Sequence, residues 1–509
     1  MLAMNEIELG DDFAAHNNLE TFMAYSCMTS ASEFLSVSFY SSDITGTTYQ
    51  PSEIVLQWKK AFKNIIAYDK FDFDGKKESM YALRPAFDTV ADMIGKGKKV
   101  PESLLEIFAQ NPEYSAKLDS LINAKDKVPF KIFDKKNAEK LFGKNLNISA
   151  SQLEKFNLCR FSYFCNYGLN VRERQRAEIN SMQYGTIVHY ILERFFGEYT
   201  KEEYLSLEED KFQKIVCAYL AEYAVKYFGE EQFESNSFTY RLKTILDNVM
   251  YLMKHIMEEL SQSEFFVADC ELKIGEDIPS YTIVLPDGHK IAVCGSVDRV
   301  DIMQRADITY LRIIDYKTGT KQFKLSDILY GINLQMLLYL HSIEASGGDK
   351  YGEIVPAGIL YMPATVPYIS SDSLKSIDKL PDELNKKLKM NGLLLKDTEI
   401  IHGMDKTDAA TYIPVKIKAG EPVSSTSLAT LAEFGKIFKK VDMLIAEMGK
   451  NIYNGNIEAK PLKGGHDSCE YCPYDSVCAY RQSNPITCFS VDNKTVIEEI
   501  TNEINGKEE

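Results

Sequence analysis

Two short stretches decide how this chain folds: Gly295-Ser296-Val297-Asp298 and Asp315-Tyr316-Lys317. They lie in two segments, 290–302 and 309–316, that are rich in β-branched and apolar residues. The polar run Gln304-Arg305-Ala306-Asp307 separates the two segments. This pattern predicts an antiparallel hairpin.

The register of the hairpin decides which side chains meet. With the turn centred on Ala306 and Asp307, Asp298 lies opposite Asp315, and their side chains are about 5 Å apart on one face. A slip of one residue would put them on opposite faces. Lys317 follows Asp315 by two residues, so its ammonium group is expected on the same face as the two carboxylates.

Two carboxylates this close repel each other unless a cation lies between them, and hard oxygen ligands of this kind suit Mg²⁺ or Mn²⁺. Such an ion can lower the pKa of a bound water, polarise a phosphodiester oxygen and offset charge during in-line attack. Lys317 could orient that water or stabilise the added negative charge. The alternative is that Asp315 and Lys317 form an ordinary ion pair at a strand end.

Two further motifs flank the hairpin. Gly185-Thr186-Ile187-Val188-His189 is predicted to open an amphipathic helix, with His189 at the edge of its apolar face. A histidine there is either a core residue bonded to a neighbour or a metal ligand. Gln335 and Tyr339 are four apart in a helical stretch predicted to start near Ser326, so they point the same way. Alone, they would be packing residues.

Taken in order, GxxxH, GxVDRVD, DYKxG and QxxxY resemble the motifs of the RecB-like branch of the PD-(D/E)XK nucleases. The resemblance implies an α/β, restriction-endonuclease-like core, in which helices flank a mixed central sheet. It implies that Lys317 lies beside the metal, and that Gln335 and Tyr339 position the substrate or brace the lysine. Glu271, in the alternating strand 265–274, matches an acidic position of this branch, although a strand glutamate usually faces solvent. The implied metal ligands are His189, Asp298, Asp315 and the backbone carbonyl of Tyr316.

The cysteines suggest a second metal centre. The chain has ten cysteines and no secretory signal, so a reducing compartment is expected and disulfides are not. The cluster Cys469-x2-Cys472-x5-Cys478 is typical of a soft metal site. Cys159 is the best candidate for a fourth ligand, in a segment where Ser151 and Glu154 are predicted to form a helix-starting capping box. From spacing alone, zinc and iron-sulfur both remain open.

One cysteine before the nuclease motifs and three after them is similar to the B subunits of AddAB-type ATP-dependent helicase-nucleases. The resemblance implies a [4Fe-4S] cluster held by Cys159, Cys469, Cys472 and Cys478, a helicase-nuclease A subunit as partner, and a single DNA strand from an unwound duplex as substrate. It implies a C-terminal fragment, with a helicase-like remnant and linker at 1–145, and the nuclease domain at 146–483. An insert at about 370–426 and a polar tail at 484–509 complete this division.

Composition sets limits on function. Of the 509 residues, 45% are hydrophobic and 26% are charged, which is typical of a globular protein. No apolar run of membrane-spanning length and no basic start occur, so a cytoplasmic protein without a membrane span is predicted. No GxxxxGK[ST] motif is present, so ATP hydrolysis is not expected. The net charge of −16 argues against a nucleic-acid binder, although a local groove can still be basic and a partner subunit can help to hold the DNA.

These features together predict a Mg²⁺-dependent deoxyribonuclease, expected to be an exonuclease, that processes DNA ends for recombinational double-strand break repair. One alternative is a stand-alone exonuclease of the CRISPR-adaptation type, which shares the nuclease motifs and the cysteines. The helicase-like remnant argues against it. The other alternative is a non-catalytic subunit that binds DNA or a partner through the cluster fold.

Overall fold

The structure is a computed structural model. It describes residues 13–40, 48–62, 65, 81–95, 98–123, 131–132, 134–172, 181–229, 236–319, 322–366, 380–407, 411–424, 426–478, 480 and 485–508. The chain divides into two compact units, Met1–Lys127 and Val128–Glu509. The second unit thus begins before the domain boundary predicted at residue 145. The reason is that Ile132 already donates its backbone N–H to the carbonyl of Gly455 at 2.7 Å.

The first unit contains a small helical core. The rings of Phe87, Phe108 and Tyr114 lie 4.9 to 5.5 Å apart, and Val90 and Leu118 complete this core. The described helices of this unit are α1 (Phe13–Thr29), α2 (Glu53–Ala61), α4 (Leu83–Gly95), α5 (Glu102–Gln110) and α6 (Ser115–Asn123).

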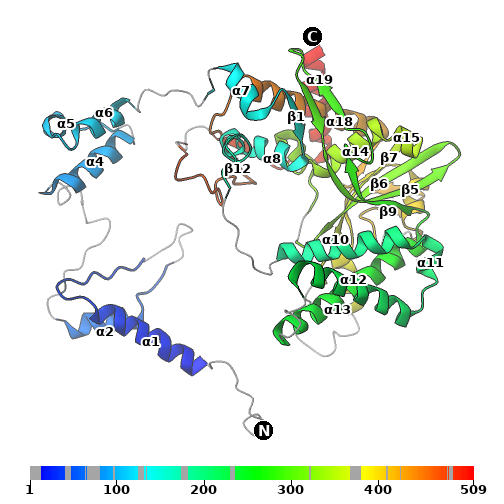
Figure 1. The fold of residues 1–509 in the computed structure, drawn as a ribbon, viewed down its shortest axis with the longest axis horizontal. Helices are drawn as coiled ribbons and strands as arrows, with labels where there is room; N and C mark the ends of the chain where they lie inside the picture. The colour runs from blue at the N-terminus through cyan, green and yellow to red at the C-terminus, as the bar shows by residue number, and fades with distance from the viewer. Residues whose placement is uncertain are drawn as a thin grey trace, which may run out of the picture. The chain divides into compact units, whose positions relative to one another are not determined.

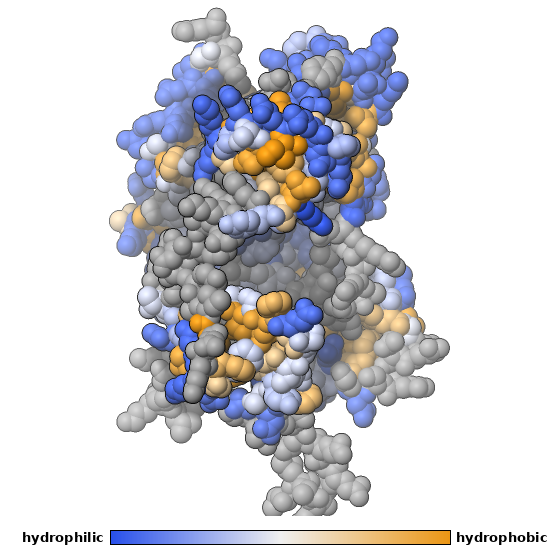
Figure 2. All heavy atoms as spheres, turned by 90° about the vertical axis from the view of Figure 1, so that its left-hand side faces the viewer, coloured by the Kyte–Doolittle hydropathy of each residue, from blue (hydrophilic) through white to orange (hydrophobic). Residues whose placement is uncertain are grey.

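Helices α1 and α2 leave apolar side chains exposed. No residue of α2 is buried, and Phe22 of α1 is 64% exposed. Figure 2 shows patches of apolar residues on the side of the molecule that faces left in Figure 1. An apolar side chain stabilises the fold only when it is removed from water. These two helices therefore add little to a hydrophobic core.

A six-stranded sheet with the order β11-β8-β7-β6-β5-β2 forms the centre of the second unit. Strands β5 and β6 are antiparallel, whereas β6 and β7 are parallel. Figure 1 shows helices α10 to α13 on one side of this sheet and α14 and α18 on the other. The predicted mixed sheet flanked by helices is therefore confirmed. Its strands are β2 (Phe266–Ile274), β5 (Gly295–Arg305), β6 (Ile308–Lys317), β7 (Glu353–Pro363), β8 (Asn391–Leu395) and β11 (Leu428–Ala429).

Smaller sheets and many helices surround this centre. A three-stranded sheet has the order β1-β4-β3, and two pairs of strands stand apart. These strands are β1 (Asn145–Ile148), β3 (Thr282–Val284), β4 (Lys290–Val293), β9 (Lys416–Lys418), β10 (Glu421–Val423), β12 (Leu462–Gly464) and β13 (Ile486–Cys488). The helices are α7 (Lys135–Phe142), α8 (Ala150–Leu158), α9 (Arg160–Tyr163), α10 (Ser181–Glu198), α11 (Lys201–Leu205), α12 (Glu209–Phe228), α13 (Asn236–Gln262), α14 (Gln335–Ser346), α15 (Gly348–Tyr351), α16 (Leu380–Leu388), α17 (Thr398–Met404), α18 (Leu431–Tyr453) and α19 (Asn493–Glu508).

Parts of the predicted insert and of the predicted polar tail belong to the packed unit. Within the predicted insert, strand β8 pairs with β7 in the central sheet, while residues 370–379, 408–410 and 425 lie outside the described residues. Within the predicted polar tail, Val496 and Ile500 of α19 are fully buried in the main core. Sparse apolar residues on a polar helix are enough to dock it, because only one face has to be apolar.

The β5–β6 hairpin carries a buried network of four charged side chains on the face toward α13. Arg299, Asp301, Arg312 and Glu259 all have 0% of their side chains exposed. Arg299 lies 2.7 Å from Asp301 and 3.1 Å from Glu259, and Arg312 lies 2.6 Å from Glu259. Two positive and two negative groups compensate each other, which is the condition for burying them at all.

Among the described residues, no helix combines the length and the apolar character needed to cross a bilayer.

We expect Arg312→Met to lower the free energy of unfolding by about 3 to 5 kcal/mol, because it leaves a carboxylate of the network without a counter-charge. Urea denaturation followed by circular dichroism measures this loss. The matched control is Arg305→Met in the same hairpin, whose partner Glu264 is 39% exposed, and we expect a loss of at most about 1 kcal/mol there. Equal losses in the two variants would contradict a structural role for the buried network.

Candidate metal centre

The two aspartates face each other where hairpin β5–β6 opens. Strand pairing runs without a shift from Arg305 opposite Ile308 to Arg299 opposite Ile314. The next pair in this register is Asp298 with Asp315. The backbone N–H of Tyr316 donates to Asp298 Oδ2 at 2.9 Å. The register predicted from the sequence is therefore the observed one.

Asp315 is held from two sides. Lys317 Nζ lies 2.5 Å from Asp315 Oδ2, and Gln335 Nε2 donates to Asp315 Oδ1 at 3.2 Å. The helical stretch predicted from Ser326 is in fact two elements, a 3₁₀ turn at Leu325–Tyr330 and helix α14, which begins at Gln335 itself. The chain breaks between them because Gly331 and Asn333 take left-handed conformations, with φ of 70° and 52°.

His189 approaches the aspartates from α10. Its Nδ1 lies 2.9 Å from Glu271 Oε1, and its Nε2 lies 3.6 Å from Asp298 Oδ2. Ser296 Oγ donates to the second oxygen of Glu271 at 2.8 Å. When His189 is neutral and its Nδ1–H donates to Glu271, the lone pair is on Nε2, the nitrogen that lies toward Asp298. One ligand atom each from His189, Glu271 and Asp298 lies within 4.8 Å of the others.

Glu271 leaves the regular conformation of strand β2. Its φ is 51°, which is uncommon for a residue other than glycine. Its neighbours Cys270 and Leu272 pair with Arg299 and Val297 of β5, so Glu271 lies opposite Asp298. A strand glutamate usually faces solvent. Glu271 instead contacts His189 and Ser296.

The site is short of positive charge. Burial, and then the charge of Asp315, raise the pKa of Asp298 to about 7. Burial lowers the pKa of His189, but the hydrogen bond to Glu271 and the charge of Asp298 outweigh it, so the pKa is raised overall. For Glu271, burial raises the pKa, yet hydrogen bonds from His189 and Ser296 lower it overall. Protons therefore compensate the carboxylates near neutral pH.

The donor set fits a divalent cation. A neutral imidazole nitrogen and carboxylate oxygens are ligands for Mg²⁺, Mn²⁺ and similar ions. A cation would replace the proton that otherwise keeps Asp298 from repelling its neighbouring carboxylates. His189 and Asp298 already lie together, and Asp315 is opposite Asp298 across the strand pair. Glu271 can act as a ligand or as the group that orients His189.

Two tyrosines of the motifs have structural contacts. The hydroxyl of Tyr316 accepts a hydrogen bond from Arg299 Nη1 at 3.2 Å on the opposite face of the sheet, so only its backbone is directed to the aspartates. Tyr339 packs so closely on Gly295 that a Cβ there would be 2.3 Å from the tyrosine hydroxyl. Tyr339 therefore supports the start of β5.

A cavity of about 670 Å³ opens beside the candidate metal ligands. Its wall includes His189 and Thr186 of α10, Glu271 of β2 and Lys317 of β6. A substrate in this cavity would therefore meet the candidate ligands and the lysine together.

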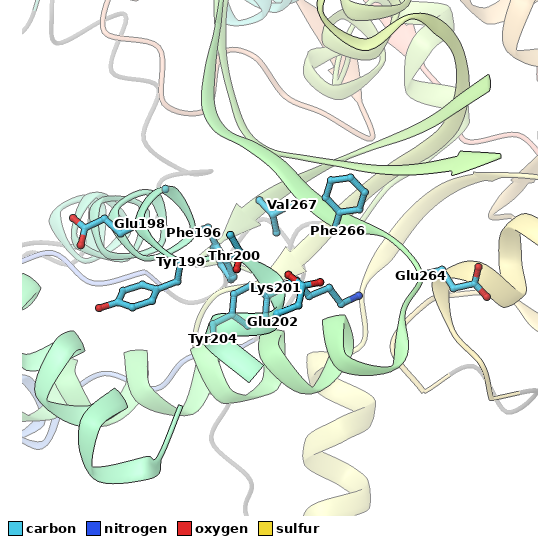
Figure 3. Close-up of a pocket in the computed structure, with 11 residues that line it drawn as sticks. Phe196, Glu198, Tyr199, Thr200, Lys201, Glu202, Tyr204, Glu264, Phe266 and Val267 are labelled. Atoms are coloured by element: carbon cyan, nitrogen blue, oxygen red, sulfur yellow. The ribbon is translucent and has the colours of Figure 1, made fainter. Parts of the chain in front are cut away.

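A larger cavity, of about 710 Å³, lies at the other end of α10 and is not the candidate site. Figure 3 shows α11 and the start of β2 around it. Among the described residues of its wall, the only lysine or arginine is Lys201, and its Nζ already donates to the backbone carbonyls of Ser263 and Phe265. The carboxylates in its wall are Glu198, Glu202 and Glu264. An anionic phosphodiester does not suit such a surface.

The distant cysteines come together in a second place. Cys159 is buried, and it shares a small cluster with Cys165, Cys472 and Cys478. Burial is the main cause that raises the pKa of Cys159, and the thiols of Cys478 and Cys472 add to it. Cys469 lies near Cys478 and raises the pKa of that thiol. The fold therefore brings the segments of these cysteines near one another, but among the described residues the group whose ligand atoms all lie within 4.8 Å of one another is His189, Glu271 and Asp298.

The helix before Cys159 starts earlier than predicted. Ser149 is the N-cap of α8, and Ser149 and Gln152 form the capping box, so the prediction for Ser151 and Glu154 is wrong. Glu154 instead accepts a hydrogen bond from the backbone N–H of Leu334 at 2.7 Å. That contact is made across 180 residues, which a local pattern does not contain.

Sequence reasoning missed the support on the opposite face of the hairpin. Arg299 and Asp301 stand inside the GSVDRVD motif, and strand alternation alone places them opposite to Asp298. Glu259 and Arg312 come from outside the motif and are found only in the fold. Ser296, which holds Glu271, was likewise not singled out.

Comparison with known proteins agrees with this geometry. Residues 147–479 match the PD-(D/E)XK nuclease superfamily. The B subunit of the ATP-dependent helicase/deoxyribonuclease of Thermoanaerobacter pseudethanolicus is 30% identical over 505 residues, which cover 94% of this chain and 43% of that protein. The protein of the same name from Clostridium acetobutylicum is 30% identical over 527 residues, with 98% and 44% covered. That from Clostridium botulinum (strain Hall) is 32% identical over 499 residues, with 93% and 43% covered.

The chain spans less than half the length of these relatives. The match at 147–479 covers more than half of the chain and contains the central sheet and all the candidate metal ligands. The chain therefore belongs to the PD-(D/E)XK nuclease superfamily.

Proposed function

We propose that this chain is a deoxyribonuclease that hydrolyses phosphodiester bonds of single-stranded DNA with a bound Mg²⁺ or Mn²⁺. The observation that carries the proposal is that His189 lies 3.6 Å from Asp298 and Lys317 lies 2.5 Å from Asp315, at the point where the two aspartates come opposite each other. Asp298, Asp315 and His189 would hold the ion, with the backbone carbonyl of Tyr316 as a further ligand. When bound, the ion would supply Lewis acidity and a water of lowered pKa.

The other side chains have supporting roles. Lys317 is 29% exposed toward solvent, so its ammonium group can hold the attacking water or a phosphate oxygen. Gln335 fixes the carboxylate of Asp315. Glu271 keeps the Nδ1–H of His189 engaged, and thereby keeps Nε2 available as a ligand.

We further propose that the chain acts in a helicase-nuclease complex, in the cytoplasm, during recombinational repair of double-strand breaks. The support is that the relatives are named as the B subunit of an ATP-dependent helicase/deoxyribonuclease. Since these 509 residues contain no GxxxxGK[ST] motif, an A subunit is the proposed source of the motor. Cys159, Cys469, Cys472 and Cys478 would hold a [4Fe-4S] cluster that joins the two ends of the nuclease domain.

We expect Asp315→Ala and Lys317→Ala each to reduce cleavage at least about 100-fold, because each removes a charge that acts on the reacting phosphate or its ion. Cleavage is measured with Mg²⁺ on single-stranded and duplex DNA, with and without the A subunit, and folding is checked by circular dichroism. Asp307→Ala, in the exposed turn of the same hairpin, should cleave like the unaltered chain. Full activity in either site variant would exclude the assignment.

Metal binding should depend on pH. Asp298 has a pKa of about 7, so below that pH a divalent ion must displace its proton. We expect the affinity for Mn²⁺, measured by titration calorimetry, to rise about ten-fold or more per pH unit up to about pH 7 and then to level off. Asp307→Asn should leave this profile unchanged. A flat profile from about pH 5 to 8 would mean that the aspartates do not form the ion site.

The cysteine centre can be tested by colour. The freshly purified chain should show visible absorbance and contain iron and sulfide, and Cys159→Ser should lose both, because a ligand of the cluster is removed. Cys217→Ser, an exposed cysteine on α12, should keep them. If the protein is colourless and binds zinc through the same four residues, the centre is a zinc site and not an iron-sulfur cluster.

A further inference from the structure

An aromatic ladder lies beside the candidate metal centre. It consists of Tyr190 of α10 and Tyr223 and Tyr227 of α12. The ring centroids of Tyr190 and Tyr223 are 5.2 Å apart, and those of Tyr223 and Tyr227 are 4.4 Å apart. All three rings line the cavity that also contains His189 and Lys317.

The ladder is fixed at its inner end. Tyr223 is 5% exposed. The hydroxyl of Tyr190 donates to Glu222 Oε1 at 2.8 Å, and Arg194 pairs with the other oxygen of Glu222 at 3.7 Å. A ring held in this way does not have to be ordered when a ligand binds, so little conformational entropy is lost.

The outer end of the ladder is open. Tyr227 is 56% exposed, although its ring packs on the buried ring of Tyr223. Lys226 Nζ lies 5.2 Å from the centroid of the same ring. The lysine lies over the ring, as in a cation–π contact. A nucleotide suits this arrangement, because its base can stack on the exposed ring while its phosphate attracts the lysine.

We infer that Tyr227, supported by Tyr223 and Tyr190, is a stacking platform for an unpaired nucleobase of the strand being cut. This inference rests on the proposed nuclease function and specifies its substrate. Bases inside a duplex have both faces covered by their neighbours, so they cannot place a face on Tyr227. The platform would therefore select single strands at a point close to the metal-binding residues, without reading the sequence.

The test compares binding of intact and abasic strands. Fluorescence anisotropy, with Ca²⁺ in place of Mg²⁺, gives the Kd of a short single-stranded DNA and of strands lacking one base at successive positions. In the unaltered chain, loss of the base at one position should weaken binding about 5- to 150-fold. Tyr227→Ala should bind the intact strand as weakly as that abasic strand, and should no longer distinguish the two.

Two variants serve as controls. Tyr227→Phe keeps the ring and should bind like the unaltered chain. Tyr240→Ala removes a tyrosine that is 73% exposed on α13 and does not line the cavity, so it should have no effect. The stacking inference is wrong if Tyr227→Ala keeps the full preference for the intact strand. It is also wrong if the unaltered chain has no affinity for single strands.

The stacking platform and the nuclease activity can fail independently of each other. If Asp315→Ala abolishes cleavage and Tyr227→Ala binds normally, the nuclease stands and the platform fails. If the abasic pattern depends on Tyr227 but no cleavage is found, the platform stands as a binding site and the nuclease fails. If Tyr227→Ala lowers the unfolding midpoint but leaves DNA binding unchanged, the ring of Tyr227 serves packing and not stacking of a base.

Discussion

The register of hairpin β5–β6 is the constraint on which the rest of the second unit depends. One face of the hairpin carries Asp298 and Asp315, and the other carries the buried pairs of Arg299 and Arg312 with Asp301 and Glu259. A slip of one residue would exchange these faces. It would place arginines in the cavity and bury two carboxylates against α13. Because an unpaired buried charge is so unfavourable, the network selects the register that the metal centre requires.

In the candidate metal centre, positive groups offset the repulsion between neighbouring carboxylates. Two aspartates on neighbouring strands repel each other, and burial raises the pKa of Asp298 to about 7. Positive groups approach from two different elements, Lys317 from β6 itself and His189 from α10. Helix α10 can hold its histidine there because Ile187, Val188 and Ile191 fix it against the core. Packing of an ordinary amphipathic helix thus determines the position of a candidate ligand.

The sequence predicted what depends on local pattern. The apolar pattern of the two strands and the polar turn between them predicted the hairpin and the pairing of Asp298 with Asp315. The helical spacing of apolar residues predicted the buried face of α10. The start of α14 was mistaken because the chain turns at the left-handed residues Gly331 and Asn333. The cap of α8 was mistaken because Ser149 and Gln152 offer the same capping pattern two residues earlier, while Glu154 bonds to the distant Leu334.

Other features were beyond local reasoning altogether. The charge network needs Glu259 from a helix distant in sequence, and α19 docks on few apolar residues. The approach of Cys159 to Cys472 and Cys478 was expected from resemblance, and the fold brings their segments together through a shared apolar cluster.

Helix α10 links the chemistry to the inferred binding surface. His189 and Tyr190 are neighbours in sequence, and successive residues of a helix point about 100° apart. One therefore reaches the carboxylates across β2 and β5, and the other reaches the rings of α12. A movement of α10 would shift the candidate ligand and the stacking rings together. The distance between a base stacked on Tyr227 and the candidate metal ligands would therefore be set by the packing of α12 on α10, which would favour cutting at a fixed position relative to that base.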